Sequence, residues 1–172
     1  MPEVALIPLT EDERRMLLRE EVADYAGQQV RGAGWPPAQA LDRAGAEITP
    51  VFDRELAEAM ASHDRLWSAK STDGQSVGWL WVKPIDSEVP SVFLEQITVA
   101  ARCRRRGYGR AMLRVLEELL AADGVEELRL NVFIANEAAR SLYSAAGYEE
   151  VGRDERRVRL RKVLQPSDTL SP

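Results

Sequence analysis

The residues best suited to chemistry are concentrated in one stretch rich in arginine and glycine, Arg102–Arg110, which reads RCRRRGYGR. Its two glycines, Gly107 and Gly109, allow the backbone to adopt a positive φ and to approach a ligand closely. Where such a turn opens a helix, its amide N–H groups converge on an anion, and nearby arginines add charge-assisted hydrogen bonds. The stretch therefore predicts a phosphate site suited to a pyrophosphate; a solvated, arginine-rich turn is the alternative.

Two common phosphate motifs do not describe this loop. No Gly-Lys-Ser/Thr follows the glycines, so the loop is not a P-loop. It also lacks the third glycine and the later acidic residue of the dinucleotide-binding fingerprint. The loop is therefore interpreted from its own glycines and arginines.

The elements on either side must position the loop between a strand and a helix. Residues 91–100 alternate with a period of two, which predicts a strand with Phe93, Glu95, Ile97 and Val99 on one face. After the loop, apolar residues recur at helical spacing until Asp123-Gly124, and this stripe predicts a helix. The stripe consists of Tyr108, Ala111, Met112, Val115, Leu116, Leu119 and Leu120.

The N-terminal third is predicted to be helical, and a β-meander follows it. Thr10 and Glu13 form a capping-box pattern that opens a helix to about Gly27. Residues 31–37 form a turn, and helical pieces begin near Pro37 and Asp53. Strands are expected at 64–70 and 76–83, joined by a hairpin turn at 72–75, with a polar loop at 84–90. Val77, Trp79 and Trp81 share one face of the second strand.

The C-terminal part alternates strands and a helix. Leu128–Val132 is expected to be a strand, Asn136 caps a helix through Ala146, and strands follow at 148–152 and 156–164. This order predicts a single domain of the α/β (α+β) class. Residues 1–62 form its helical part, residues 63–164 its sheet and core, and residues 165–172 a tail.

Composition narrows the function classes. The 172 residues carry a net charge of −5, no apolar run long enough for a membrane span, and one cysteine, so a cytoplasmic protein is expected. An acidic chain disfavours nucleic-acid binding, and no His/Cys/Asp cluster has metal-ligand spacing. Residues 1–86 hold 9 basic and 15 acidic residues, which is compatible with a cationic acceptor such as a polyamine, an aminoglycoside or a lysine side chain.

Two segments resemble signatures of the GNAT N-acetyltransferases. Val99–Gly109, VAARCRRRGYG, resembles their acyl-CoA loop, and Leu128–Tyr148, LRLNVFIANEAARSLYSAAGY, resembles their second signature. The resemblance extends over residues 64–164. It departs from the family pattern at Ala101 and Cys103, where proline and an aromatic residue are frequent, and at Arg105, where a small or polar residue is common.

The resemblance implies a mostly antiparallel mixed sheet flanked by helices, splayed at the strand that binds acetyl-CoA. It implies that the amides of Arg105–Arg110 hold the pyrophosphate and that the edge of Ile97–Val99 pairs with the pantetheine. The implied coenzyme contacts are Ile97, Thr98, Val99, Arg104, Arg105, Arg106, Gly107, Tyr108, Gly109, Arg110 and Asn136. Asn136 also serves as a helix cap in this interpretation.

Two residues are candidates for proton transfer. Glu95 is interpreted as a general base acting through a water, because partial burial strengthens a carboxylate as a base; a structural carboxylate is the alternative. The N–H of Val99 or Ile97 is the candidate oxyanion donor. Tyr143 matches the family tyrosine near the coenzyme sulfur and is interpreted as the acid, with core packing as the alternative.

The remaining candidates concern the acceptor. Tyr25, Trp35 and Trp81 are expected to line its cleft. His63 is interpreted as an incidental polar residue and Cys103 as a packing residue, because direct attack needs no covalent intermediate.

The predicted activity is therefore acetyl transfer from acetyl-CoA to a primary amine of a small molecule or peptide. A non-catalytic acyl-CoA-binding module is the alternative, and an RNA-directed acetyltransferase, suggested by the arginine run, is disfavoured by the acidic total. The closing strands are compatible with pairing across a homodimer.

Overall fold

The chain folds into two compact units, as described by a computed structural model of residues 1–61 and 64–165. One unit comprises Met1–Pro8 and the chain from Asp64 onward, and the other comprises Leu9–His63. Each unit has its own cluster of buried apolar side chains. The predicted site loop and both signature segments lie in the first unit.

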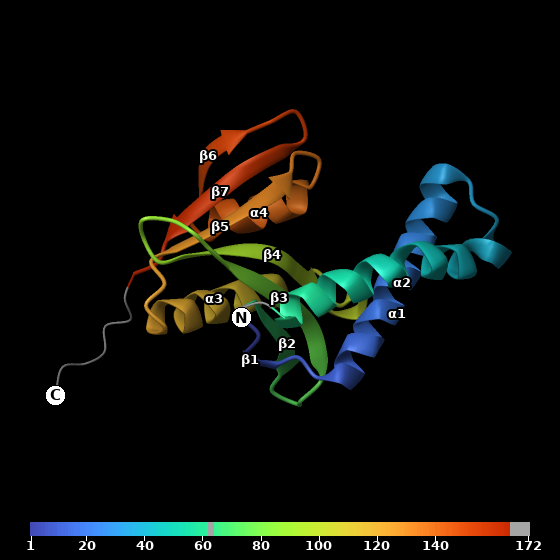
Figure 1. The fold of residues 1–172 in the computed structure, drawn as a ribbon, viewed down its shortest axis with the longest axis horizontal. Coiled ribbons are helices and arrows are strands. Elements are labelled where there is room, and N and C mark those ends of the chain that lie inside the picture. The colour runs from blue at the N-terminus through green and yellow to red at the C-terminus, as the bar shows by residue number, and fades with distance from the viewer. Residues whose placement is uncertain (62–63, 166–172) are drawn as a thin grey trace. The chain divides into compact units, whose positions relative to one another are not determined.

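The larger unit is built on a seven-stranded sheet with the order β1-β2-β3-β4-β5-β7-β6 (Figure 1). Within the described sheet only β4 and β5 run parallel, and all other neighbours are antiparallel. The predicted mixed, mostly antiparallel sheet is confirmed. The strands are β1 (Val4–Pro8), β2 (Arg65–Ser71), β3 (Ser76–Ile85), β4 (Ser91–Val99), β5 (Glu127–Phe133), β6 (Glu149–Arg153) and β7 (Arg157–Val163).

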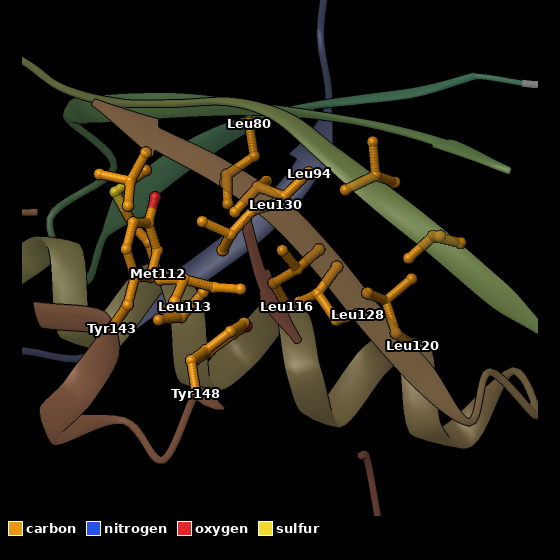
Figure 2. Close-up of a cluster of buried hydrophobic side chains, with 14 of the residues drawn as sticks. Leu80, Leu94, Met112, Leu113, Leu116, Leu120, Leu128, Leu130, Tyr143 and Tyr148 are labelled. Carbon is orange, nitrogen blue, oxygen red and sulfur yellow. The ribbon is translucent and has the colours of Figure 1, made fainter. Parts of the chain in front are cut away.

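Helix α3 (Tyr108–Ala122) supplies much of the core of this unit. Most of its predicted apolar face is buried, but Tyr108 and Val115 are only half-buried and Leu119 is 39% exposed, whereas Leu113 is buried although it was not part of the predicted face. Figure 2 shows these side chains packed against leucines of the sheet. A fully buried leucine side chain contributes about 1.5–3 kcal/mol, so this face fixes α3 against the sheet. The buried residues of α3 are Ala111, Met112, Leu113, Leu116 and Leu120.

The parallel pair β4 and β5 separates halfway along its length. Residues Ser91–Leu94 pair with Glu127–Leu130, but β4 continues to Val99 and β5 continues to Phe133 without pairing to each other. Beyond Leu94, β4 is paired to β3 alone, and β5 is paired to β7 alone. The splay expected at the coenzyme-binding strand is therefore confirmed.

A β-bulge at Glu95 corrects the predicted face of β4. Gln96 lies opposite Trp81 and Leu94 lies opposite Val82, so Glu95 is an extra residue without a partner on β3. A bulge shifts the alternation of side chains by one position. The prediction that Phe93 and Glu95 share a face with Ile97 and Val99 is therefore wrong.

Two features of the sheet were not predicted. Val4–Pro8 forms the edge strand β1 against β2, whereas the first element predicted from the sequence begins at Thr10. Strand β3 extends to Ile85 through Pro84, where a loop was expected. Proline is tolerated at this position because β2 pairs only as far as Val82, so the missing N–H removes no hydrogen bond to β2.

The smaller unit is a pair of helices. Helix α1 (Glu11–Ala33) starts with the predicted capping box at Thr10 and Glu13, and continues past Gly27 to a left-handed Gly34. Helix α2 (Pro37–Ala61) is one helix, whereas two pieces were predicted. It contains Pro50, which lacks the N–H for an i to i−4 hydrogen bond and favours a local kink.

Packing within the helix pair is apolar with polar cross-links. Ala26, Ala40 and Ala44 are buried between the helices. Arg14 Nη1 lies 3.0 Å from Asp53 Oδ1, an ion pair between α1 and α2. Asp53 therefore connects the two helices instead of capping a third.

Candidate active site

A cavity of about 760 Å³ occupies the splay between β4 and β5. Its size is within the range typical of small-ligand sites. Helix α4 (Glu137–Ala145) and the first turn of α3 complete its walls. Six of the predicted site residues line it: Glu95, Ile97, Val99, Gly109, Asn136 and Tyr143.

The inner edge of β4 directs backbone groups toward this cavity. Ala100 N donates to Val77 O at 2.9 Å, which sets the alternation of hydrogen bonds between β3 and β4. Val99 and Ile97 therefore direct their N–H and C=O groups away from β3, toward the splay. Thr98, in contrast, directs its backbone to β3, and its hydroxyl accepts a hydrogen bond from Gln96 Nε2 at 2.9 Å. Thr98 is thus turned away from the cavity.

The loop before α3 has the turned backbone that its glycines predicted. Gly107 has φ 85°, and Arg105 also adopts a positive φ of 62°, which is rare for a residue with a side chain. The first helical bond runs from Ala111 N to Gly107 O at 3.1 Å, so the amides of Tyr108, Gly109 and Arg110 have no acceptor within the helix. These N–H groups and the helix dipole form a place for an anion.

The arginines of this loop have different surroundings. Arg104 Nε donates to Val99 O at 3.0 Å, and Arg102 donates to Ser76 O, so both fasten the loop to the sheet. Arg105, Arg106 and Arg110 are exposed beside the turn. Of the predicted phosphate contacts, these three retain the freest side chains, whereas Tyr108 packs against the core.

Glu95, at the bulge, forms an ion pair with Lys83. Lys83 Nζ lies 2.7 Å from Glu95 Oε1, and the Glu95 side chain is 32% exposed. Both residues line the cavity. Because cross-strand partners share a face, Lys83 and Phe93 lie on the side of the sheet opposite α3, and Glu95 opens toward that side.

Tyr143 is a residue of α4 and packs within the apolar core (Figure 2), and it also lines the cavity. The residue is 5% exposed, and its ring centroid is 5.4 Å from that of Tyr148. Burial raises the pKa of Tyr143 to about 12. The hydroxyl is therefore protonated at neutral pH and available as a hydrogen-bond donor.

The raised pKa of Tyr143 predicts alkaline instability. The neutral phenol is stabilised by the fold, so its contribution is complete below the unfolded pKa of about 10 and disappears as the pH passes about 12. As the pH rises through these two pKa values, the free energy of unfolding should fall in both proteins. We expect this fall to be about 2–3 kcal/mol smaller in the Tyr143→Phe variant than in the wild type. Urea unfolding at mildly and strongly alkaline pH measures the difference. Equal losses in the two proteins would contradict the prediction.

Asn136 caps α4 as predicted. Its side-chain oxygen accepts a hydrogen bond from Ala139 N at 3.1 Å. The residue also lines the cavity, next to the first turn of α4. The cap fixes the start of the helix that carries Tyr143.

The predicted acceptor residues are divided between the two units. In the helical unit, Tyr25 donates to Glu47 Oε2 at 2.9 Å and makes an edge contact with Trp35 at 6.0 Å. In the sheet unit, Trp81 donates to Asp64 Oδ2 at 2.7 Å and does not line the cavity. For all three, an acceptor-lining role stays a prediction.

Cys103 is buried in the core cluster, as predicted, and does not line the cavity. His63 lies outside the described residues. In the part of the chain that the structure describes, no group of three or more His, Cys, Asp or Glu side chains is arranged to hold a metal ion. Within residues 1–61 and 64–165, none of the helices combines the length and hydrophobicity that a membrane span requires.

Sequence reasoning missed several residues on the side of the cavity opposite α3. Lys83, Phe93, Asn131, Phe133 and Arg157 come from strands β3, β4, β5 and β7. Their convergence depends on strand register, for example Phe133 opposite Arg157, which no local pattern encodes. One sequence signal could have pointed to part of this set. Arg129, Asn131 and Phe133 alternate along one strand, which places them on the same face of it.

Comparison with known proteins identifies the class. The model of the acetyltransferase (GNAT) family matches residues 34–148. An uncharacterized N-acetyltransferase of Bacillus subtilis, YycN, is 30% identical over 149 residues, covering 86% of this chain and 93% of the relative. Its crystal structure superposes with a TM-score of 0.64 at 29% identity, covering 88% of this chain and 95% of that one. The chain belongs to the GNAT acetyltransferase family.

Two further relatives have named activities. Aminoglycoside N(6')-acetyltransferase type 1 of Serratia marcescens is 30% identical over 143 residues, covering 78% of this chain and 89% of the relative. Spermidine N-acetyltransferase of Vibrio cholerae, crystallised with CoA and spermine, has a TM-score of 0.67 at 16% identity, with 95% and 97% of the two chains covered. The latter likeness concerns the fold alone.

Proposed function

We propose that this protein is an acetyl-CoA-dependent N-acetyltransferase that acts on a primary amine by direct attack. The observation that carries this proposal is the splay itself, where a free strand edge, a turned loop at a helix start and Tyr143 meet at one cavity. Similar proteins crystallised with CoA support the same assignment. Tyr143 serves as the general acid and Glu95 as the general base.

The residues present fit acetyl-CoA along its length. The amides of Tyr108–Arg110 and the exposed arginines Arg105, Arg106 and Arg110 suit a pyrophosphate. The N–H and C=O of Ile97 and the N–H of Val99 suit the amides of a pantetheine arm, in the manner of an added β-strand. Acetyl-CoA supplies an acetyl group activated as a thioester.

The chain's own groups then account for both proton movements. Net transfer forms an N–C bond and breaks a C–S bond, so the amine must lose a proton and the sulfur must gain one. Glu95 accepts the amine proton through a water, while Lys83 holds its carboxylate at the cavity. The N–H of Ile97 or Val99 polarises the carbonyl. The Tyr143 hydroxyl donates to the leaving sulfur.

Direct attack is supported by the placement of the one cysteine. Cys103 is 8% exposed within the core and is separate from the cavity lining, so no thiol is positioned to carry the acetyl group. The amine must therefore reach the thioester itself. This requirement makes correct placement of the acceptor, and not activation of a protein nucleophile, the main contribution of the protein.

The proposal is tested by calorimetric titration with acetyl-CoA together with an assay of CoA release across primary amines. We expect the wild type to bind acetyl-CoA and to release CoA only when an amine is present. Glu95→Gln should bind acetyl-CoA normally and transfer about 100-fold more slowly. Binding without turnover of any amine would favour the non-catalytic alternative, and no binding of acetyl-CoA, CoA or longer acyl-CoAs would overturn the proposal.

A further inference from the structure

The charged side chains that line the cavity sum to one positive charge, and Asp154, outside the lining, interacts with that charge electrostatically without forming an ion pair. Among the described residues that line it, three are charged: Lys83, Glu95 and Arg157. Lys83 and Glu95 neutralise each other at 2.7 Å. The Arg157 guanidinium forms no ion pair with another described residue and lies 4.7 Å from the centre of the Phe133 ring. The lining therefore carries a net charge of one, and that charge belongs to Arg157.

Arg157 lies on the side of the sheet away from the coenzyme loop. It pairs with Phe133 across β5 and β7, so the two side chains share a face. Leu130 and Val132 on the same strand pack into the core that α3 covers, and Phe133 alternates with Val132, so Phe133 and Arg157 face the other way. Glu95 opens to this face as well. The coenzyme loop and Arg157 thus belong to opposite mouths of one cavity.

The guanidinium is held in place without using its hydrogen-bond donors. Phe133 is 52% exposed and forms a platform beneath it. The Asp154 carboxylate accepts hydrogen bonds from the backbone amides of Arg156 and Arg157, both at 2.8 Å, and this fixes the start of β7. A stacked guanidinium with free N–H groups matches a carboxylate in bidentate geometry.

We propose that Arg157 binds a carboxylate of the acceptor, so that the acceptor is an amine carrying a carboxylate, as in an amino acid. This inference rests on the proposed acetyl transfer and specifies its substrate class. It is opposite in sign to the cationic acceptor that the acidic N-terminal half suggested, and it differs from the spermidine and aminoglycoside activities named for similar proteins. The part of the cavity lining that carries Arg157 favours an acceptor with an anionic group beside its amine.

The test compares the standard L-amino acids with their carboxamides, and both with spermidine and kanamycin, as acceptors in the CoA-release assay. We expect the wild type to use its best amino acid with a kcat/KM about 10- to 100-fold above that of the matching carboxamide, because the carboxamide lacks the charge that Arg157 pairs with. Arg157→Gln should reduce this ratio to about 1.

Arg159→Gln is the matched control, because Arg159 is two residues along β7 on the same face and does not line the cavity. It should keep the wild-type ratio. Titration with acetyl-CoA distinguishes the inferred acceptor class from the proposed acetyl transfer. Arg157→Gln should bind the coenzyme as the wild type does. This inference alone would be overturned if the wild type bound acetyl-CoA but used carboxamides or polyamines as well as or better than amino acids. It would also be overturned if the wild type bound acetyl-CoA but acetylated no carboxylate-bearing amine. Failure of the wild type to bind acetyl-CoA would overturn the proposed function with it.

Discussion

Replacing Gly107 by glutamate is expected to weaken acetyl-CoA binding by about 100-fold or more. Gly107 has φ 85°, and it immediately precedes the helix whose first amides have no intrahelical acceptor. A carboxylate at this position competes for those amides and repels a pyrophosphate. Calorimetric titration of the variant with acetyl-CoA measures the loss directly.

Gly124→Glu is the control, because it imposes the same backbone strain without a ligand nearby. Gly124 has φ 79° and follows the other end of α3, and a Cβ there meets nothing within 4 Å. A side chain in the left-handed region costs about 1–2 kcal/mol in either variant. A Cβ at Gly107 would also lie 3.2 Å from Pro2 Cδ, so Gly107→Glu should lose at least as much thermal stability as Gly124→Glu, but only Gly107→Glu should lose affinity for the coenzyme. Unchanged acetyl-CoA affinity in Gly107→Glu would place the pyrophosphate elsewhere.

The proposed coenzyme side of the site could be predicted because its determinants are local. About 20 consecutive residues contain the glycine turn, the start of the helix and its apolar stripe, whose spacing is that of a helix. The cap at Asn136 is similarly local, since its acceptor oxygen and the Ala139 amide are three residues apart. These features followed from residue type and spacing, and the structure places them as expected.

The proposed acceptor side could not be predicted, because it depends on contacts between distant strands. The bulge at Glu95 is a mismatch between β3 and β4, and strict alternation along β4 alone gave the wrong face. Arg157 meets Phe133 only through the register of β5 and β7. One residue of slip would reverse both faces, so no pattern within a single strand specifies them.

The helical unit shows a different limit. Gly27 and Pro50 are poor helix formers, and the sequence predicted a helix end at about Gly27 and a separate helical piece from Asp53, just after Pro50. In the structure both lie inside longer helices, where α1 and α2 bury Ala26, Ala40 and Ala44 between them. Packing along a helix pair outweighs the local cost of about 1 kcal/mol for glycine and about 3 kcal/mol for proline.

The bulge also bears on how β4 would serve both substrates of the proposed reaction. On the loop side of Glu95, Ile97 and Val99 face the core that α3 covers and offer backbone groups to the splay. At the bulge, the Glu95 side chain turns to the opposite face, where Lys83 and Arg157 line the cavity. A regular strand would place the carboxylate on the face of Ile97, beside the coenzyme. The extra residue therefore sets the proposed base on the acceptor side of the thioester.

Replacing Tyr143 by phenylalanine is expected to lower kcat about 100-fold while leaving the affinity for acetyl-CoA within about threefold of the wild type. The ring remains to fill the junction of α4 and the core, so only the hydroxyl is lost. With a pKa of about 12, the phenol is less acidic than a thiol, whose pKa is about 8.5. The Tyr143 hydroxyl is therefore expected to stabilise the sulfur by a hydrogen bond as negative charge develops there. Full transfer of its proton to the sulfur would require a second proton to reach the phenol oxygen at the same time. Steady-state kinetics with the best acceptor separates kcat from KM.

Tyr148→Phe is the matched control for this prediction. Tyr148 is 7% exposed, contacts the Tyr143 ring at 5.4 Å and does not line the cavity. Burial, and secondarily the negative charge of Glu117, raise the pKa of Tyr148, so it is also a neutral phenol in the core. Its hydroxyl is buried without a hydrogen-bond partner among the described residues, so its removal should not lower the unfolding free energy and should leave kcat within about threefold of the wild type. Equal kcat losses in the two variants would show that the tyrosines act through packing, and an unchanged kcat in Tyr143→Phe would assign protonation of the sulfur to another group.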